Sequence, residues 1–345
     1  MIPTNKYIRL LKTLFSIKIL GKRAPLFALM LLTNRCNSNC SYCNIPNRKH
    51  DELDLKQVIS IIDGLVEEGT FRIGFYGGEA LIRPDIDKIV GYAKQSGLVT
   101  HIYTNGKLVK EKLEILKQVD GVFISLDGPK TVHDKLRGSG SYDHVIEAMH
   151  AMKESGIPFY IMTVVTNSNT SYLHYVSNLA KEFDCPLNFQ IVTQISELSA
   201  DVSEHALGRE KLHTVLDEIL ALKKENKKIV NSNTYLKRLK KLEHNYHRTG
   251  YQQGIVKCWN GRASCQIDAD GSLHSCLGLL GKERNLNLKE HSVKEAFHFL
   301  EDCKCEECEH ACSVEYNLWL SLNPESVFNV LCYYVTSILF SGTRK

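Results

Sequence analysis

The stretch Arg35-Cys36-Asn37-Ser38-Asn39-Cys40-Ser41-Tyr42-Cys43 places three cysteines in one short loop. It directly follows the apolar run 26–32, which has the composition of a buried strand. We therefore expect the thiols on the loop that leaves the carboxyl end of that strand, where α/β sheets and barrels build their sites. Thiolates bind soft metals, and iron–sulfur clusters are normally held by four cysteines. Three cysteines can hold three corners of a cubane and leave its fourth iron open.

A second motif follows the next strand-like run. Residues 71–76 are rich in β-forming side chains and lead into Gly77-Gly78-Glu79. Two glycines at a strand end let the backbone approach a ligand closely. The carboxylate beside them can accept a hydrogen bond from an ammonium group. Such a triplet alone is usually a turn, but here it follows the cysteine loop by one strand.

The C-x3-C-x2-C spacing, with an aromatic residue before the last cysteine and Gly-Gly-Glu one strand later, resembles the radical S-adenosylmethionine (radical SAM) superfamily. The resemblance implies that the three loop cysteines hold a 4Fe-4S cluster whose open iron is chelated by S-adenosylmethionine (SAM). An electron from the cluster would then cleave SAM to methionine and a 5′-deoxyadenosyl radical. The resemblance also implies that Tyr42 lies against the adenine and that Gly77-Gly78-Glu79 binds the methionine amino group.

A structural zinc site is the alternative for the cysteine loop. Zinc takes four ligands, with cysteines typically at C-x2–4-C spacing. A nearby fourth ligand could only be a residue such as His50.

Helix-like and strand-like patterns alternate along the chain. We expect strands at 26–32, 71–76, 99–103, 121–126, 158–165 and 187–192, and helices at 53–68, 86–96, 108–118, 142–155 and 171–183. Six strands that alternate with helices argue for parallel βαβ units of an α/β fold. The radical SAM core is a partial (β/α)6 TIM-like barrel, so the resemblance covers residues 25–195.

Three further residues match positions that the family often uses around SAM. Asn105 follows the third expected strand and Ser125 ends the fourth. The resemblance implies that both line the SAM pocket and that Arg137 pairs with the SAM carboxylate. Each of the three could instead be a turn or capping residue.

Cysteines also crowd the last quarter of the chain: Cys258, Cys265, Cys276, Cys303, Cys305, Cys308, Cys312 and Cys332. Residues 265–276 are typical of a hairpin with Asp270-Gly271 at its turn. An upstream cysteine, then G-x4-C and a later C-x2-C, resembles the SPASM/twitch extensions that carry auxiliary iron–sulfur clusters. The resemblance implies that auxiliary ligands come from these cysteines, with Cys258, Cys265 and Cys276 as the first half.

The second half departs from the SPASM pattern, because the chain has C-x-C-x2-C-x3-C where that pattern has C-x2-C-x5-C-x3-C. The eight cysteines could hold two four-ligand clusters, or one cluster with spare thiols. We therefore expect one or two auxiliary 4Fe-4S clusters. Cys332 lies in an apolar stretch and also fits an ordinary buried cysteine, as does Cys185.

Both ends of the chain have a composition typical of segments that contact membranes. Residues 1–35 hold seven basic residues and no acidic one, interleaved with apolar side chains as in a basic amphipathic helix. Such a helix can lie on an anionic membrane. Residues 326–342 are uncharged and mostly apolar, at the lower limit of a membrane span. A helix packed within the protein is the alternative for both ends.

These patterns divide the chain into a basic N-terminal segment (1–24), the barrel (25–195), a helical connector (196–255) and a Cys-rich domain with an apolar C-terminal helix (256–345). The low-potential cluster favours a reducing cytoplasm, with peripheral association at the inner face of the membrane. The formal net charge of +4 is too small to indicate nucleic acid.

The resemblance implies an enzyme that abstracts hydrogen from an unactivated C–H position, with a reductant such as flavodoxin or ferredoxin. The membrane-like ends favour a lipid or lipid-linked substrate, and only about 25 residues precede the first strand, which leaves no room for a separate peptide-recognition domain. A peptide is the alternative substrate, because SPASM-type extensions are most familiar in peptide-modifying enzymes. A non-enzymatic iron–sulfur electron carrier is the alternative of another class, and it needs neither Gly77-Gly78-Glu79 nor an open iron.

Overall fold

The computed structural model describes residues 4–241, 257–302, 308 and 310–329. In this part of the chain one sheet has eight strands, in the order β6-β5-β4-β3-β2-β1-β7-β8. Neighbouring strands are parallel except for the antiparallel pair β7 and β8. The strands are β1 (Phe27–Leu31), β2 (Arg72–Tyr76), β3 (Val99–Thr104), β4 (Gly121–Ser125), β5 (Phe159–Val165), β6 (Leu187–Ile191), β7 (Ser264–Ile267) and β8 (Leu273–His274).

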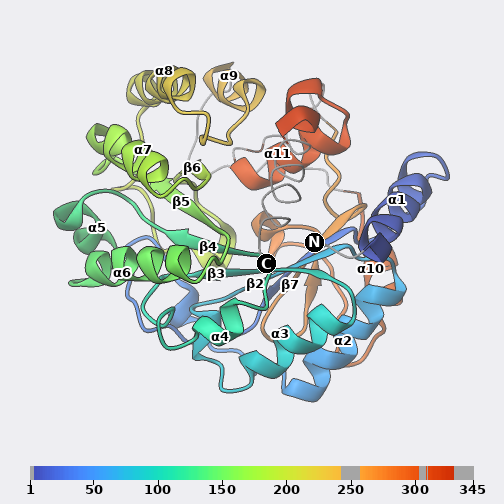
Figure 1. Ribbon diagram of the computed structural model, residues 1–345. Coiled ribbons are helices and arrows are strands. Elements are labelled where there is room, and N and C mark those ends of the chain that lie inside the picture. The colour runs from blue at the N-terminus through green and yellow to red at the C-terminus, as the bar shows by residue number, and fades with distance from the viewer. Residues whose placement is uncertain (1–3, 242–256, 303–307, 309, 330–345) are drawn as a thin grey trace.

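Helices surround this sheet (Figure 1). They are α1 (Thr4–Lys18), α2 (Leu55–Glu67), α3 (Ile86–Gln95), α4 (Leu113–Leu116), α5 (Lys130–Arg137), α6 (Ser141–Glu154), α7 (Leu173–Glu182), α8 (Arg209–Glu225), α9 (Asn233–Lys241), α10 (Val293–Phe299) and α11 (Ala311–Leu320). The predicted α/β fold with six parallel βα units is confirmed. Each predicted strand lies within a residue or two of its observed bounds.

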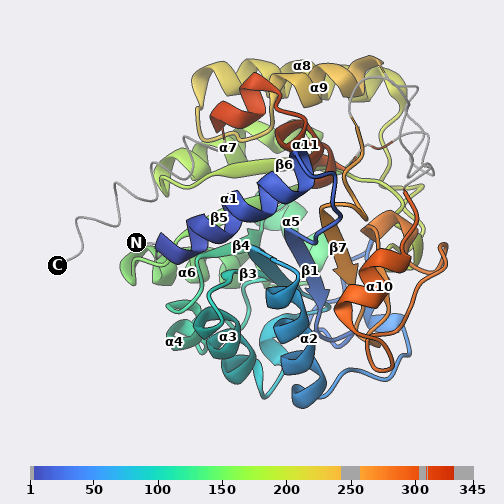
Figure 2. The same cartoon turned by 90° about the vertical axis from the view of Figure 1, so that its right-hand side faces the viewer.

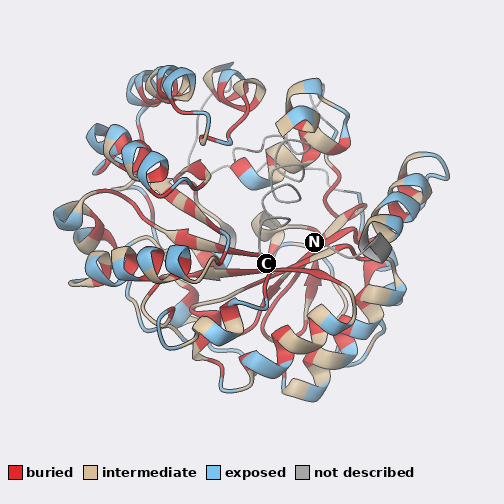
Figure 3. Cartoon of the chain, viewed as in Figure 1, coloured by how far each residue is buried: buried red, intermediate tan, exposed pale blue. Residues whose placement is uncertain are grey.

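The side of the sheet that faces the helices forms the main hydrophobic core. Ile102 of β3 and Ile124 of β4 are fully buried in it, together with Ile62 of α2 and Val90 of α3. Full burial of a side chain of this size contributes about 1.5–3 kcal/mol. Figure 3 shows that the strands are mostly buried and that exposure is concentrated on the outer faces of the helices.

The Cys-rich segment begins within the same sheet. The predicted hairpin is present as β7 and β8, and β7 pairs with β1 in parallel, so that Cys265 lies opposite Ala28. The sheet therefore continues across the expected boundary at residue 256.

Helix α11 spans the opening between β6 and β7 (Figure 1). Strand β6 is the last strand of the six-stranded barrel, and β7 is the first strand added beyond β1. On one side, the Ala311 amide donates to Oε1 of Gln190 on β6 at 2.7 Å. On the other, the Tyr316 hydroxyl donates to the carbonyl of Ala263, just before β7. The Tyr316 ring also lies 4.6 Å from the ring of Phe27 at the start of β1.

Some expected helices differ from the observed ones. The helix expected at 108–118 is only the single turn of α4, while α5 is a helix that the periodicity does not predict. Most of the apolar C-terminal helix expected at 326–342 lies outside the described residues. No helix in the described part of the chain is long and apolar enough to cross a membrane.

Candidate functional site

The cysteine loop follows β1 and is tied to two distant segments. The Ser41 amide donates to the carbonyl of Leu136 at 3.0 Å, and Cys43 forms a β-bridge with Ser199. The thiols of Cys36, Cys40 and Cys43 are free and half-buried. Burial raises the pKa of all three, that of Cys43 to about 11. A metal must therefore displace protons to bind here.

The two glycines after β2 let that strand's end pack against the cysteine loop. The Gly78 amide donates to the Thr33 carbonyl at 2.8 Å, and the Glu79 amide donates to the Arg35 carbonyl at 2.9 Å. A Cβ atom on Gly77 would overlap the Thr33 carbonyl, and one on Gly78 would overlap the Arg35 carbonyl. The two glycines thus let the end of β2 lie close to the backbone that leads into Cys36.

Glu79 is a buried carboxylate held by three protein donors. Its Oε1 accepts from the Leu81 amide at 3.1 Å. Its Oε2 accepts from the Thr104 hydroxyl at 3.0 Å and from the Asn105 amide at 2.8 Å. Burial raises the pKa of Glu79 to about 7 against the opposing effect of these hydrogen bonds. An ionised carboxylate can accept about four hydrogen bonds, so acceptor capacity remains on Oε1.

Asn105, which follows β3, connects Glu79 with the cysteine loop. Its amide donates to Glu79, and its side-chain Nδ2 lies 3.8 Å from the Cys36 sulfur. The same Nδ2 donates to Oδ1 of Asn37 at 2.8 Å. The carboxyl ends of β1, β2 and β3 thus bring Cys36, Glu79 and Asn105 together, as predicted for parallel strands.

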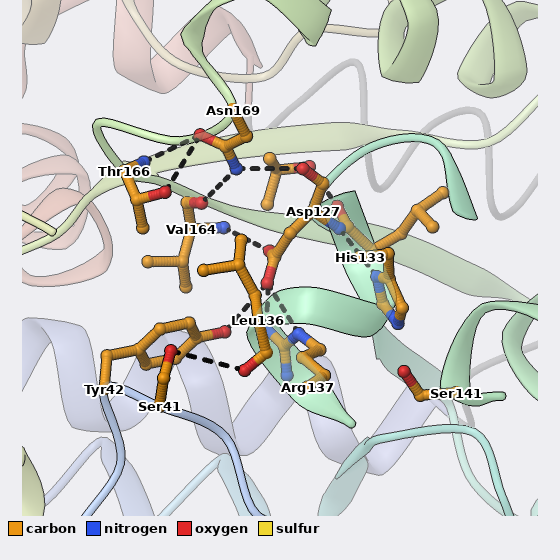
Figure 4. A network of polar contacts seen from close by, with 12 residues as sticks. Ser41, Tyr42, Asp127, His133, Leu136, Arg137, Ser141, Val164, Thr166 and Asn169 are labelled. Carbon is orange, nitrogen blue, oxygen red and sulfur yellow. Dashed lines mark hydrogen bonds and ion pairs between the residues drawn. The ribbon is translucent and has the colours of Figure 1, made fainter. Parts of the chain in front are cut away.

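Asp127, two residues beyond β4, organises a second group of side chains (Figure 4). Its Oδ2 accepts from the Tyr42 hydroxyl at 2.8 Å and from Nε of Arg137 at 2.6 Å. Its Oδ1 accepts from the Val164 amide at 2.8 Å. Burial alone would raise the pKa of Asp127, but the Arg137 charge and these hydrogen bonds hold it below its usual range. Asp127 therefore stays ionised in a buried site.

Tyr42 is within the cysteine loop and Arg137 lies beside it, and the polar groups of both are directed to Asp127 (Figure 4). The Arg137 guanidinium lies 5.5 Å from the centre of the Tyr42 ring, and the His205 ring lies edge-on at 5.9 Å. The Arg137 charge also acts on the Cys40 thiol, lowering a pKa that burial raises. Sequence reasoning missed Asp127, although a carboxylate directly after a buried strand was an available signal.

Ser125 is the last residue of β4 and is half-buried. Because side chains alternate along a strand, it points to the face opposite Ile124, away from the helix-side core. It lies two residues before Asp127 and pairs in register with Met162 of β5.

The C-terminal cysteines have varied surroundings. Cys265 is buried in the main core, where burial raises its pKa to about 12. Cys258 is half-buried, with Nδ2 of Asn317 3.8 Å from its sulfur, while Cys312 is exposed in the first turn of α11. Cys276, which follows β8, and Cys308 are half-buried. Two of the predicted ligands, Cys303 and Cys305, lie outside the described residues, as does Cys332.

Within the described ranges, no three His, Cys, Asp or Glu side chains converge on a point where they could hold one metal ion. A zinc site at the cysteine loop would need such convergence, and His50 is exposed. A cubane differs because its cysteines bind separate irons, so their sulfurs need not converge.

Comparisons with known proteins agree with this geometry. A family model described as the Radical SAM superfamily matches residues 30–179. The mycofactocin maturase MftC of Mycobacterium ulcerans is 30% identical over 266 residues, which cover 74% of this chain and 69% of that protein. An uncharacterized protein of Methanocaldococcus jannaschii is 38% identical over 157 residues, which cover 42% of this chain and 54% of that protein. The chain spans 65% of MftC from Mycobacterium tuberculosis, and thus between about half and two thirds of several relatives.

The fold is similar to that of SuiB from Streptococcus suis. The structure of SuiB bound to S-adenosylmethionine superposes with a TM-score of 0.67 at 17% identity, covering 82% of this chain and 68% of SuiB. SuiB bound to the precursor peptide SuiA gives a TM-score of 0.66, also at 17% identity, covering 83% of this chain and 67% of SuiB. At this identity the likeness concerns the fold. With the maturase relative and the family model, it leads to one conclusion: the chain belongs to the radical SAM superfamily.

Proposed function

We propose that Cys36, Cys40 and Cys43 hold a 4Fe-4S cluster and that Glu79 binds the amino group of SAM. The observation that carries this proposal is the position of Asn105. Its backbone amide is 2.8 Å from Oε2 of Glu79, and its side chain is 3.8 Å from the Cys36 sulfur. Asn105 therefore contacts both the buried Glu79 carboxylate and the free thiol of Cys36.

The residues of the site fit these two groups. The three thiols are free, and Glu79 retains acceptor capacity on Oε1 toward a ligand. Its three protein donors hold the carboxylate in one orientation before any ligand arrives, which lowers the entropic cost of binding. When bound, the cluster and SAM would supply a 5′-deoxyadenosyl radical that takes a hydrogen atom from the substrate.

Asp127 would keep the other side of the site in place. By accepting from Tyr42 and Arg137 at once, it holds an aromatic ring and a cation beside Cys40. We expect the Tyr42 ring to remain available to the adenine, because the hydrogen bond to Asp127 uses only its hydroxyl. Arg137, Asn105 and Ser125 would complete the SAM pocket.

The substrate we propose is a peptide. The relatives that align over 74% of this chain are named as maturases of mycofactocin, and SuiB has been crystallised with its precursor peptide. The lipid substrate favoured by the composition of the chain ends finds no support in these comparisons. Turnover would draw electrons from a reductant such as flavodoxin or ferredoxin.

At least one auxiliary 4Fe-4S cluster is part of this proposal. Its candidate ligands in the described residues are Cys258, Cys276, Cys308 and Cys312. Cys265 fits a ligand role least, because it is enclosed in the hydrophobic core and its thiol pKa is raised to about 12.

The test uses the full chain, purified and reconstituted with iron and sulfide without oxygen. The reduced protein should convert SAM to 5′-deoxyadenosine, measured by liquid chromatography, whereas an electron carrier would not. Short peptides encoded beside the gene would then be added, and mass spectrometry should detect a changed peptide mass together with increased 5′-deoxyadenosine. SAM cleavage without a change in any such peptide would contradict the substrate proposal alone.

A further inference from the structure

Helix α1 is fixed to the protein by its inner face. Arg9 donates to the Ser96 carbonyl at 3.1 Å, and the Thr13 hydroxyl donates to the Gly69 carbonyl at 2.9 Å. Ile17, one turn further on, is buried in the cluster that contains Phe27. These residues are spaced by four, so one stripe of the helix makes the contacts. The orientation of the opposite face is thereby set.

The outer face of α1 is apolar and exposed. Ile8, Leu11 and Phe15 have exposed fractions of 49%, 66% and 55%, and Ile19, directly after the helix, is 68% exposed. Figure 2, which faces this side of the molecule, shows α1 lying across the surface next to α11. Large exposed apolar patches on soluble proteins commonly mark interaction sites.

The patch continues onto the segment that follows α11. Leu322 is 71% exposed and Phe328 is 65% exposed. A hollow of about 750 Å³ lies between the two segments, with Leu11 and Phe15 on one side and Leu322 and Val327 on the other. We refer to Ile8, Leu11, Lys12, Phe15, Ile19, Lys22, Leu322 and Phe328 as the α1 surface.

The exposed charges on α1 and on the turn after it are positive. Residues 1–24 hold six Lys or Arg and no Asp or Glu. Lys12 is exposed beside Leu11, and Lys22 is exposed just beyond the end of the helix. Exposed apolar side chains flanked by cations fit the interface of an anionic membrane, where the apolar groups enter the acyl boundary and the cations meet the headgroups.

We propose that the α1 surface lies on an anionic lipid membrane. This inference is independent of the proposed SAM chemistry, since it uses none of the site residues. Helix α1 packs on Gly69 and Ser96, which precede β2 and β3, at the amino-terminal end of the sheet. The cysteine loop follows β1 at the opposite, carboxyl end. Membrane contact would therefore tether the protein while its candidate site faces away from the lipid.

The test is co-sedimentation of the full chain with phosphatidylcholine vesicles and with vesicles that also contain phosphatidylglycerol. Binding should require phosphatidylglycerol and weaken in high salt, because exposed charges are screened over about 8–10 Å at physiological ionic strength. Lys12→Ser and Lys22→Ser should each lower the partition coefficient about fivefold. Phe15→Ser should lower it about tenfold or more. Phe299→Ser is the matched control, since Phe299 is 38% exposed on α10 and lies outside the α1 surface.

Four results would overturn the proposal. The first is a full chain that does not sediment with either kind of vesicle. The second is a chain that self-associates and that Phe15→Ser converts to a monomer without changing vesicle binding. The α1 surface would then be the interface with a second copy of the chain. The third is equal loss of vesicle binding in the Phe15→Ser and Phe299→Ser variants. The fourth is a large loss of thermal stability in Phe15→Ser, measured without vesicles. It would show that the α1 surface packs against another part of the same chain and does not contact a membrane.

Discussion

Nε of Arg137 donates to Oδ2 of Asp127 at 2.6 Å, and the side chains are 10% and 0% exposed. The same Oδ2 atom accepts from the Tyr42 hydroxyl. One buried carboxylate therefore orients two side chains from separate parts of the chain. It also joins the cysteine loop to the ends of β4 and β5, because the Val164 amide donates to its other oxygen.

Asp127→Asn should destabilise the protein strongly. It removes one partner of a buried ion pair and leaves the Arg137 charge uncompensated, which typically costs about 3–5 kcal/mol. Urea unfolding of the reconstituted proteins measures the effect. Lys130→Ala is the control, because Lys130 and Asp143 form an exposed pair, with side chains 57% and 52% exposed, and its loss should leave the midpoint unchanged. Equal midpoints for the Asp127 and Lys130 variants would show that the network is not structural.

Replacement of Cys36, Cys40 and Cys43 together by Ala should abolish SAM cleavage while iron remains at the C-terminal sites. Cys258 precedes β7 and Cys36 follows the parallel strand β1, so these two cysteines lie toward opposite ends of the sheet. Iron and sulfide analysis is combined with the 5′-deoxyadenosine assay. Cys185→Ala, at a buried cysteine of the core, should keep both cluster content and cleavage. A triple variant without any iron would remove the case for auxiliary clusters.

The strands could be predicted from the sequence because each is a short apolar run between polar turns. The run 121–126 differs from the bounds of β4 by a single residue. Helix α5 could not be predicted in this way. Its buried residues are His133, Leu136 and Arg137, so burial there does not follow apolar periodicity.

The part of the site that depends on distant contacts was also beyond prediction. The cysteine loop and Gly77-Gly78-Glu79 are local motifs, and their strands bring them together. Asp127 is followed by glycine, as in an ordinary turn, and its partners Tyr42 and Val164 are 85 and 37 positions away in the sequence. The position of Asp127 after a buried strand was a local signal, but its partners have no local pattern, because the tertiary fold brings them together.

Gly78→Ala should disrupt the junction between β2 and the cysteine loop. The new Cβ would overlap the Arg35 carbonyl, and backbone cannot move aside as a flexible side chain can. Overpacking of this kind costs about 1–3 kcal/mol. Gly91→Ala is the matched control, because Gly91 lies in α3 and its new Cβ would make only ordinary contact, so that variant should gain about 0.5–1 kcal/mol. Urea unfolding and cluster content report on both, and equal stability of the two variants would contradict this role for Gly78.

SAM affinity should rise with pH through the pKa of Glu79. Burial raises that pKa to about 7 in the free protein, so below this pH the side chain is mostly protonated and cannot accept a charge-assisted hydrogen bond. Above it, the carboxylate is present and the bond to the SAM amino group is worth about 1.5–3 kcal/mol. Glu79→Gln should therefore weaken binding about ten- to hundredfold at pH 8 and only about two- to tenfold at pH 6, where about a tenth of the Glu79 side chains are ionised.

Equilibrium dialysis of SAM against the oxidised, reconstituted protein gives both affinities across this range without turnover. The amino group of SAM also titrates, but it does so equally for wild type and variant, so the ratio of the two affinities isolates Glu79. That ratio should be about five- to tenfold larger at pH 8 than at pH 6. A ratio that is large and constant over the range would mean that Glu79 is already ionised at pH 6. A ratio of one throughout would mean that Gly77-Gly78-Glu79 serves only to join β2 to the cysteine loop.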